Sequence, residues 1–166
     1  DIKPPSNLKK FISVSSAEDM YQAVVSNLDE NDVVIKSAAV ADYKPKEYSD
    51  KKIKKKDGDL VIELDRNKDI AYEIGKIKKD KILVGFAAET NDIIENAKGK
   101  IAKKNMDFIV ANNLKESGAG FGTDTNVVSI IEKDGSMKKY PMMTKEEVAS
   151  VILDKIKVLL DEKSSL

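Results

Sequence analysis

Short apolar runs alternate with helical patterns along this sequence, and the alternation restricts the fold more than any other feature. The predicted strands are residues 11–14, 32–39, 60–64, 81–86 and 107–111, followed by a hairpin of residues 126–132 and 137–141. The predicted helices are residues 15–28, 69–78, Thr90 or Asn91 to Lys104, and 144–160. This order predicts an α/β fold, a Rossmann-like three-layer domain with a mainly parallel sheet plus a C-terminal β-hairpin and helix.

Local signals support several of these elements. Ser15-x-x-Glu18 and Thr144-x-x-Glu147 are capping-box patterns at helix starts. Asp134-Gly135 suits a tight type I′ turn in the hairpin. The run of residues 32–39 is apolar almost throughout, which is typical of a parallel strand covered on both faces. The last helix is predicted to bury a stripe formed by Val148, Val151, Ile152, Ile156, Leu159 and Leu160.

Composition excludes several classes of function. The 29 basic and 29 acidic residues cancel, which argues against non-specific binding to nucleic acid or a membrane surface. No apolar run approaches the roughly 20 residues that a membrane-spanning helix needs. With no Cys and no His, the chain has no thiolate, imidazole base or histidine-ligated zinc. The absence of Cys fits a cytoplasmic protein.

Lysine is the main cation of this chain, because Arg66 is its one arginine. Five lysines occur between Lys51 and Lys56, soon after Asp42 and a predicted strand end. Residues 43–59 have no useful periodicity and are predicted to form a long loop or flap. Such a run is either a solvated surface loop or a flap that closes over phosphates.

Three predicted strands end in small or polar residues, in the sequences "SAAVAD", "GFAAET" and "VANN". Ligands of parallel α/β sheets bind at the carboxyl ends of the strands. Alanines there, such as Ala38, Ala39, Ala87 and Ala88, either pack beneath helices or let a ligand approach the backbone.

The helix after "GFAAET" carries two lysines on or beside its apolar stripe. Ile93, Ala97 and Ile101 define the stripe. On the helical wheel Lys104 falls between Ile93 and Ala97, and Lys100 falls just beside Ile93. Two interpretations are open: the lysines extend their ammonium groups into water, or they bind a polyanion. The sequence "GAGFG" at residues 118–122 is not a dinucleotide fingerprint, since a strand-like segment follows it.

An ordered set of motifs resembles one family. The motifs are "SAAVADYKP", "KIKKKDG", "LVIEL", "RNKDI", "LVGFAAET", "KIAKKNMDFIVANN" and "GFGTDTNVVSII", between about Val14 and Leu160. Together they closely resemble the phosphopantothenate–cysteine ligase family, which in bacteria is usually the C-terminal half of a bifunctional coenzyme A biosynthesis flavoprotein. The resemblance implies condensation of 4′-phosphopantothenate with cysteine through an acyl-cytidylate, using CTP and Mg²⁺.

The resemblance also implies site residues and partners. Ala38, Ala39 and Asp42 would contact phosphopantothenate, with Asp42 also near the nucleotide, and Lys52 would be the catalytic lysine. The residues implied to bind the nucleotide are Asp42, Lys52, Lys68, Asp69, Ile70, Ala71, Phe86, Lys100 and Lys104. Metal ligands are not implied. Members are homodimers, and FMN belongs to an upstream, covalently linked decarboxylase domain rather than to this chain.

Two departures from the family pattern matter. Lys68 replaces the proline of the usual Asn-Pro-Asp-Ile. The family's first strand, its glycine-rich phosphate loop and an asparagine acting on the acyl intermediate precede the matched region. Residues 1–166 are therefore expected to be a single, N-terminally incomplete ligase domain, with an apolar sheet edge that favours association and with weak or absent activity in isolation. The alternatives are a Rossmann-like NAD(P)-binding oxidoreductase and a non-catalytic dimerisation module.

Overall fold

The computed structural model describes residues 4–54, 59–89, 93–113 and 122–165, without the side chains of Glu89 and Ile93. Its contacts divide the chain into two compact units. The first unit consists of Asp1–Asn27 and Ala39–Ile70, and the second of Leu28–Ala38 and Ala71–Leu166. The single domain expected from the sequence stays a prediction.

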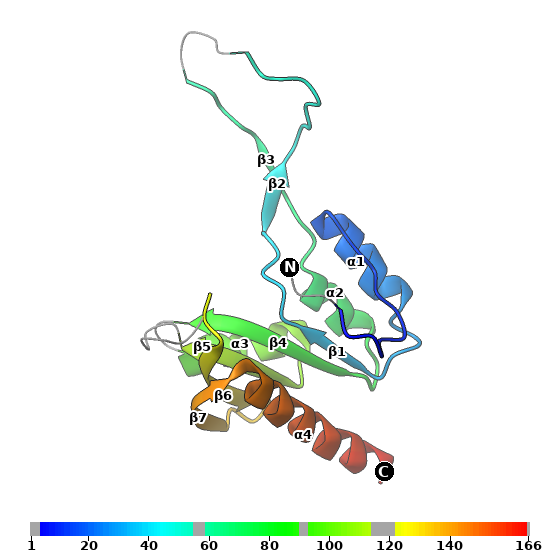
Figure 1. The fold of residues 1–166 in the computed structure, drawn as a ribbon, viewed down its shortest axis with the longest axis vertical. Helices are drawn as coiled ribbons and strands as arrows, with labels where there is room; N and C mark the ends of the chain where they lie inside the picture. Colours follow the sequence, from blue (N-terminus) through cyan, green and yellow to red (C-terminus); the bar gives the residue numbers. More distant parts are fainter. Residues whose placement is uncertain (1–3, 55–58, 90–92, 114–121, 166) are drawn as a thin grey trace. The chain divides into compact units, whose positions relative to one another are not determined.

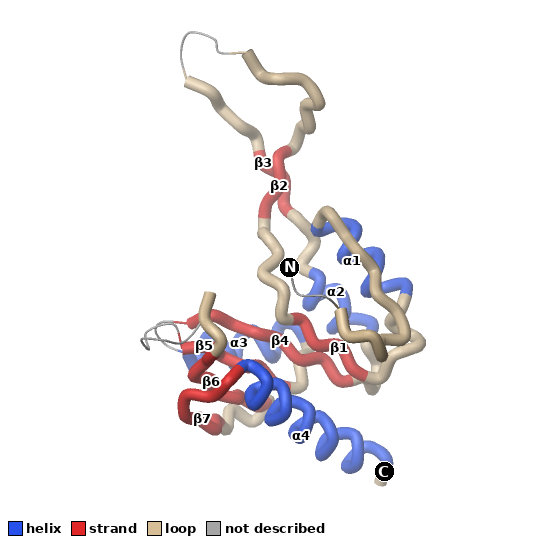
Figure 2. The backbone as a smooth tube through the Cα atoms, in the orientation of Figure 1, coloured by secondary structure: helices blue, strands red, loops and turns tan. Residues whose placement is uncertain are grey.

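The second unit is built on a mixed sheet (Figures 1 and 2). Its described strands follow the order β1 (Val33–Lys36), β4 (Ile82–Glu89), β5 (Phe108–Asn113), β6 (Thr125–Glu132) and β7 (Met137–Thr144). The pairs β1–β4 and β4–β5 are parallel, whereas β5–β6 and β6–β7 are antiparallel. The predicted α/β fold, with a parallel sheet extended by a C-terminal hairpin and a helix, is confirmed.

Helices cover both faces of this sheet. Helix α4 (Lys145–Ser164) packs on one face, where the buried cluster consists of Ile82, Val84, Phe108, Val110, Val128, Ile130, Val148, Ile152 and Ile156. Helix α2 (Ile70–Ile77) precedes β4 in the chain and α3 (Ile93–Lys104) follows it, and α3 lies behind the sheet in Figure 1. Asn105, just after α3, donates a hydrogen bond to Gly75 of α2, so the two helices share that side. The connections from β1 to β4 and from β4 to β5 are parallel crossovers that step across the sheet in the same direction. Because such crossovers are right-handed, their helices lie on the same face.

Helix α4 begins and packs as the sequence predicts. Thr144 is its N-cap, and the reciprocal bonds with Glu147 complete the capping box. Val148, Ile152 and Ile156 are buried, and the rest of the predicted stripe packs against them. None of the described helices is both long and apolar enough to span a bilayer.

The β6–β7 hairpin forms, but its turn is not type I′. A type I′ turn needs positive φ at both central residues, whereas Gly135 (φ +84°) is the one such residue here. The amide of Gly135 donates to the Glu132 carbonyl (3.0 Å), and the amide of Glu132 donates to the Ser136 carbonyl (3.0 Å). The connection is a three-residue loop in which the glycine takes the left-handed position after an ordinary turn.

The first unit contains α1 (Ala17–Ser26) and a short antiparallel pair, β2 (Tyr43–Pro45) with β3 (Leu64–Arg66). The N-cap of α1 is Ser16, paired with Asp19, so the predicted box at Ser15 and Glu18 is wrong by one residue. The predicted strand at residues 11–14 does not form. The predicted strand at residues 60–64 is assigned only from Leu64, and the predicted loop begins with β2.

Strand β1 differs from its prediction in length and burial. It ends at Lys36 rather than at Ala39, and it lies at the edge of the sheet with β4 as its described partner. Ile35 is 43% exposed, so the prediction of a strand covered on both faces is wrong. An apolar side chain on an edge strand agrees with the apolar edge expected from the sequence.

Candidate functional site

The carboxyl ends of β1 and β4 meet at one edge of the second unit, because the two strands are parallel. Ala38 is exposed just after β1, where its carbonyl accepts a hydrogen bond from the Lys36 ammonium (3.1 Å). Phe86 alternates with Ile82 and Val84, so its ring lies on the face that α4 covers. The ring is 36% exposed, which shows that α4 leaves this part of the face open.

Asn112 lies on the same face and was not predicted as a site residue. Its register neighbours are Ala88 on β4 and Val128 on β6, neither of which offers a side-chain donor. The side-chain oxygen of Asn112 is buried and has no hydrogen-bond partner within the described residues. A buried acceptor without a donor is rare, and a ligand donor would satisfy it. The doubled asparagine of "VANN" was the sequence signal for this position.

The α3 lysines lie on the other side of the sheet. Ala97 and Ile101 are buried, Lys104 is half-buried and Lys100 is exposed. The half-burial of Lys104 agrees with its predicted place on the apolar stripe, whereas Lys100 lies further out. Because α3 covers the face opposite α4, these lysines and the Phe86 ring extend from opposite faces of the sheet. The predicted capping residues Thr90 and Asn91 lie outside the described residues.

Within the first unit, the structure brings two predicted motifs together. The backbone amide of Asn67 donates to the Asp42 carbonyl (2.8 Å), and the Asn67 side chain donates to the Ala41 carbonyl (2.9 Å). Asp42, which is exposed, is therefore next to the segment that begins at Lys68. This contact joins the "SAAVAD" and "RNKDI" motifs, which the sequence separates by more than twenty residues.

Lys68, the residue that departs from the family pattern, is bound to α1. Its ammonium lies 2.9 Å from the Glu18 carboxylate and 4.3 Å from the centre of the Tyr21 ring. Hydrogen bonds from Gln22 and Lys68 lower the pKa of Glu18. Ile70 and Ala71 are 4% and 1% exposed. A ligand would therefore meet this segment mainly through backbone amides, which are unpaired in the first turn of a helix.

Lys52 lies in the irregular segment between β2 and β3, and Lys51, Lys52 and Lys54 are all exposed. Lys55 and Lys56 lie outside the described residues. Lys52 makes no ion pair or hydrogen bond within the part of the chain that the structure describes. Lys52 belongs to the first unit and the α3 lysines to the second, so their convergence on one ligand stays a prediction.

Two further observations concern a cleft in the second unit and the groups that could hold a metal ion. A cleft of about 300 Å³ is lined by Lys98, Ile101, Ala102, Asn105 and Lys133, and it contains none of the predicted site residues. No group of three acidic side chains that could hold a metal ion occurs among the described residues. Magnesium bound mainly by phosphates of a nucleotide needs only one or two protein carboxylates. The exposed Asp42 is compatible with that arrangement.

Comparison with known proteins decides the family. The family described as DNA/pantothenate metabolism flavoprotein C-terminal domain matches residues 1–159. The chain belongs to this family. It is 53% identical over 155 residues to the coenzyme A biosynthesis bifunctional protein CoaBC of Bacillus subtilis. The aligned region covers 93% of this chain and 38% of that protein. The family recognised from the ordered motifs is thereby confirmed.

Two other similarities are informative. The chain is 48% identical over 160 residues to a cysteine/cysteine sulfinic acid decarboxylase of an unknown prokaryotic organism, covering 96% of this chain and 45% of that protein. A crystal structure of the C-terminal domain of CoaBC matches with a TM-score of 0.80 at 41% identity, over 97% of this chain and 72% of that chain. The chain thus spans less than half the length of the curated relatives that it matches.

Proposed function

We propose that this chain is part of a phosphopantothenate–cysteine ligase acting in coenzyme A biosynthesis in the cytoplasm. The observation that carries the proposal is 41% identity to the C-terminal domain of CoaBC, on the same fold and over 97% of this chain. The positions of Asp42 beside the "RNKDI" segment and of Ala38 at a strand end add support. The decarboxylase name of one relative belongs to a protein more than twice the length of this chain.

The proposed reaction has two steps. A carboxylate oxygen of 4′-phosphopantothenate attacks the α-phosphorus of CTP, the bond to the β-phosphate breaks, and pyrophosphate leaves. The amine of cysteine then attacks the acyl carbon, and CMP leaves with the oxygen that came from the carboxylate. The substrates provide both nucleophiles, so a chain without His or Cys can catalyse the reaction by positioning its substrates and by stabilising charge.

The proposed roles follow the types of group that the chain offers. The exposed ammonium of Lys52 would stabilise charge that develops at the α-phosphate. Lys100, Lys104 and the amides around Ala71 would hold the nucleotide, with Asp42 and Phe86 nearby. Mg²⁺ would accompany the triphosphate and offset its charge. Asn112 would accept a hydrogen bond from a hydroxyl or amide of the pantothenate moiety, which would satisfy its buried oxygen.

A homodimer is also proposed, together with a covalently linked flavin-dependent decarboxylase domain. The apolar side chains of Leu60, Val61 and Ile62 are 61–82% exposed in the described part of the chain. An exposed apolar segment of this kind supports the proposal, because a second chain that covered it would remove apolar surface from water.

The test is a ligase assay with the full-length protein, using phosphopantothenate labelled with ¹⁸O in its carboxylate. The proposal predicts phosphopantothenoylcysteine, pyrophosphate and CMP that carries one ¹⁸O atom. Faster turnover with ATP than with CTP would contradict the choice of nucleotide. Unlabelled CMP would contradict the acyl-cytidylate, and the absence of ligation with either nucleotide would overturn the proposed activity.

A further inference from the structure

The C-terminal end of α3 is closed by an unusual backbone conformation. Asn105 follows Lys104 in the left-handed region, with φ +49°. The Met106 amide donates to the Ile101 carbonyl (3.1 Å), which is the long closing bond of a helix that ends at a left-handed residue. Asparagine tolerates this conformation better than most residues. The backbone at Lys104 is therefore fixed by the residue that follows it.

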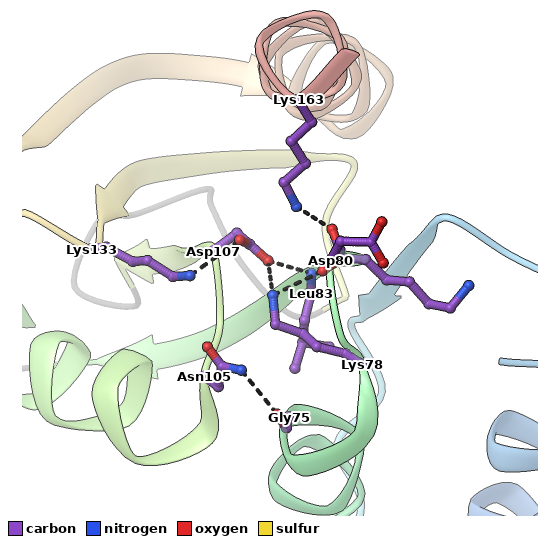
Figure 3. Close-up of polar contacts among 9 residues, drawn as sticks. Gly75, Lys78, Asp80, Leu83, Asn105, Asp107, Lys133 and Lys163 are labelled. Atoms are coloured by element: carbon purple, nitrogen blue, oxygen red, sulfur yellow. Dashed lines mark hydrogen bonds and ion pairs between the residues drawn. The ribbon is translucent and has the colours of Figure 1, made fainter. Parts of the chain in front are cut away.

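The Asn105 side chain fixes the same helix end to α2. Its amide donates to the Gly75 carbonyl (2.9 Å), as Figure 3 shows. Gly75 is buried in α2, and a Cβ atom there would lie 1.9 Å from the Lys104 carbonyl oxygen. Glycine inside a helix costs up to about 1 kcal/mol, so its presence agrees with a need for close approach. We refer to these contacts as the Gly75–Asn105 junction.

A buried ion pair supports the junction. The Lys78 ammonium lies 2.5 Å from the Asp107 carboxylate and donates to the Lys81 carbonyl (2.8 Å), and Lys78 is only 3% exposed. Asp107 also accepts from the Leu83 amide (2.7 Å) and lies 3.3 Å from the Lys133 ammonium (Figure 3). The end of α2 is thus joined at two points to the segment that runs from α3 into β5.

We propose that Asn105 and Gly75 are positioning residues for Lys104. The junction holds the last turn of α3, and with it the backbone from which the Lys104 side chain extends, at a fixed place relative to α2. Helix α2 carries Ala71, whose amide belongs to the other proposed nucleotide-binding segment. The junction therefore sets the spacing between two groups that would bind one nucleotide. This inference rests on the proposed function, since it needs Lys104 to contact that nucleotide.

The test compares CTP binding by variants of the full-length protein, measured by calorimetry. Asn105→Gly keeps the left-handed backbone but removes the hydrogen bond that the side-chain amide donates to Gly75. Gly75→Ala places a methyl group against the Lys104 carbonyl. Because displacements of about 1 Å have large effects on bound groups, we expect the dissociation constant for CTP to rise about threefold to tenfold in each. The KM for cysteine should stay unchanged. Circular dichroism checks that each variant is folded.

Gly99→Ala is the matched control, because a Cβ atom at this position of α3 would meet nothing within 4 Å. It should bind CTP like the unmodified protein. A second control repeats Asn105→Gly in a Lys104→Ala background, where a residue that acts through Lys104 has no further effect on CTP binding. A purely structural residue would weaken binding equally in both backgrounds.

Three results would overturn the inference. The first is unchanged CTP binding by Asn105→Gly and Gly75→Ala while Lys104→Ala weakens it. The second is an equal effect of Asn105→Gly with and without Lys104. The third is unchanged CTP binding by Lys104→Ala itself. None of these contradicts the proposed activity, which the isotope assay tests independently.

Discussion

Asp107, just before β5, contacts three other segments of the second unit: Lys78 after α2, Leu83 in β4 and Lys133 in the β6–β7 turn. Burial raises the pKa of its carboxyl group, but hydrogen bonds from Lys78 and Leu83 outweigh burial and lower it overall. Burial lowers the pKa of Lys78, and the bond to Asp107 opposes this without cancelling it. Hydrogen bonding therefore decides the direction of the pKa shift of Asp107, whereas burial decides that of Lys78. We expect an ionised Asp107, because three donors surround it.

Replacement of Asp107 should therefore destabilise the fold. In Asp107→Asn the Lys78 ammonium stays buried without its counter-charge, and breaking such a pair typically costs about 3–5 kcal/mol. Urea denaturation of this variant measures the loss. Asp154→Asn, at an exposed position of α4, is the control and should change the free energy of unfolding by less than about 0.5 kcal/mol. Equal stability of the two variants would contradict the role of the pair.

The same residue predicts how stability depends on pH. Because the pKa of Asp107 is lower in the folded chain than its ordinary 3.8, the unfolded chain takes up the proton first. Its contribution to stability is present above pH 3.8 and is lost as the pH falls through the lowered folded value. Between about pH 2 and 6, the melting temperature of the unmodified protein should fall more steeply with decreasing pH than that of the Asp107→Asn variant. Parallel curves would contradict the prediction.

Lys52 should affect catalysis without affecting stability. Its side chain is exposed and has no partner among the described residues, so Lys52→Gln should leave the melting temperature unchanged. Loss of a cation at the α-phosphate should lower kcat by about 10²–10³. Lys51→Gln, in the same exposed run, is the matched control and should retain most of its activity. Similar kcat values for the two variants would remove Lys52 from the mechanism.

At the scale of elements, local signals predicted helix starts and the hairpin better than isolated strands. Thr144 with Glu147, and Asp134 with Gly135, mark the β6–β7–α4 region through contacts within a few residues. Residues 11–14 have strand-like composition but form no strand, because a strand also needs a partner that no local pattern encodes. Exposure of Ile35 was missed for the same reason, since edge position depends on topology.

Two neighbouring residues of α4 test how this helix is held. Ile152 is 4% exposed in the core, whereas Leu153 is 58% exposed. Ile152→Ala should cost about 2–5 kcal/mol, because it leaves a cavity between α4 and the sheet. Leu153→Ala, with the same number of carbons removed, should cost less than about 1 kcal/mol. Chemical denaturation of both variants makes the comparison, and similar losses would contradict the packing described here.

At the scale of the whole molecule, some candidate site residues could be predicted from the ordered motifs, whereas others became apparent only in the structure. The motifs predict site roles for Asp42 and the Lys68 segment, which stay predictions, and the structure brings these two segments together through Asn67. They did not identify Asn112 or the Gly75–Asn105 junction, because burial of an unpaired oxygen and close approach of two helices are non-local properties.

Association is the prediction at this scale. If a second copy covers the exposed apolar residues near Ile62, then Ile62→Glu should shift the protein from dimer toward monomer. Sedimentation velocity at several concentrations measures the shift. Leu153→Glu, another exposed apolar position, is the control and should leave the dimer intact. A monomer before any substitution, or an Ile62→Glu variant that stays dimeric, would contradict this interface.

Lysines from two separate parts of the chain are proposed to bind one triphosphate. The most direct measurement is a crystal structure of the full-length protein with CTP and phosphopantothenate. We predict that the phosphates lie within hydrogen-bonding distance of Lys104 in one protomer and of Lys52 in the same protomer or its partner. CTP bound away from these lysines, or contacting Lys52 while Lys100 and Lys104 both stay remote in every subunit, would contradict it.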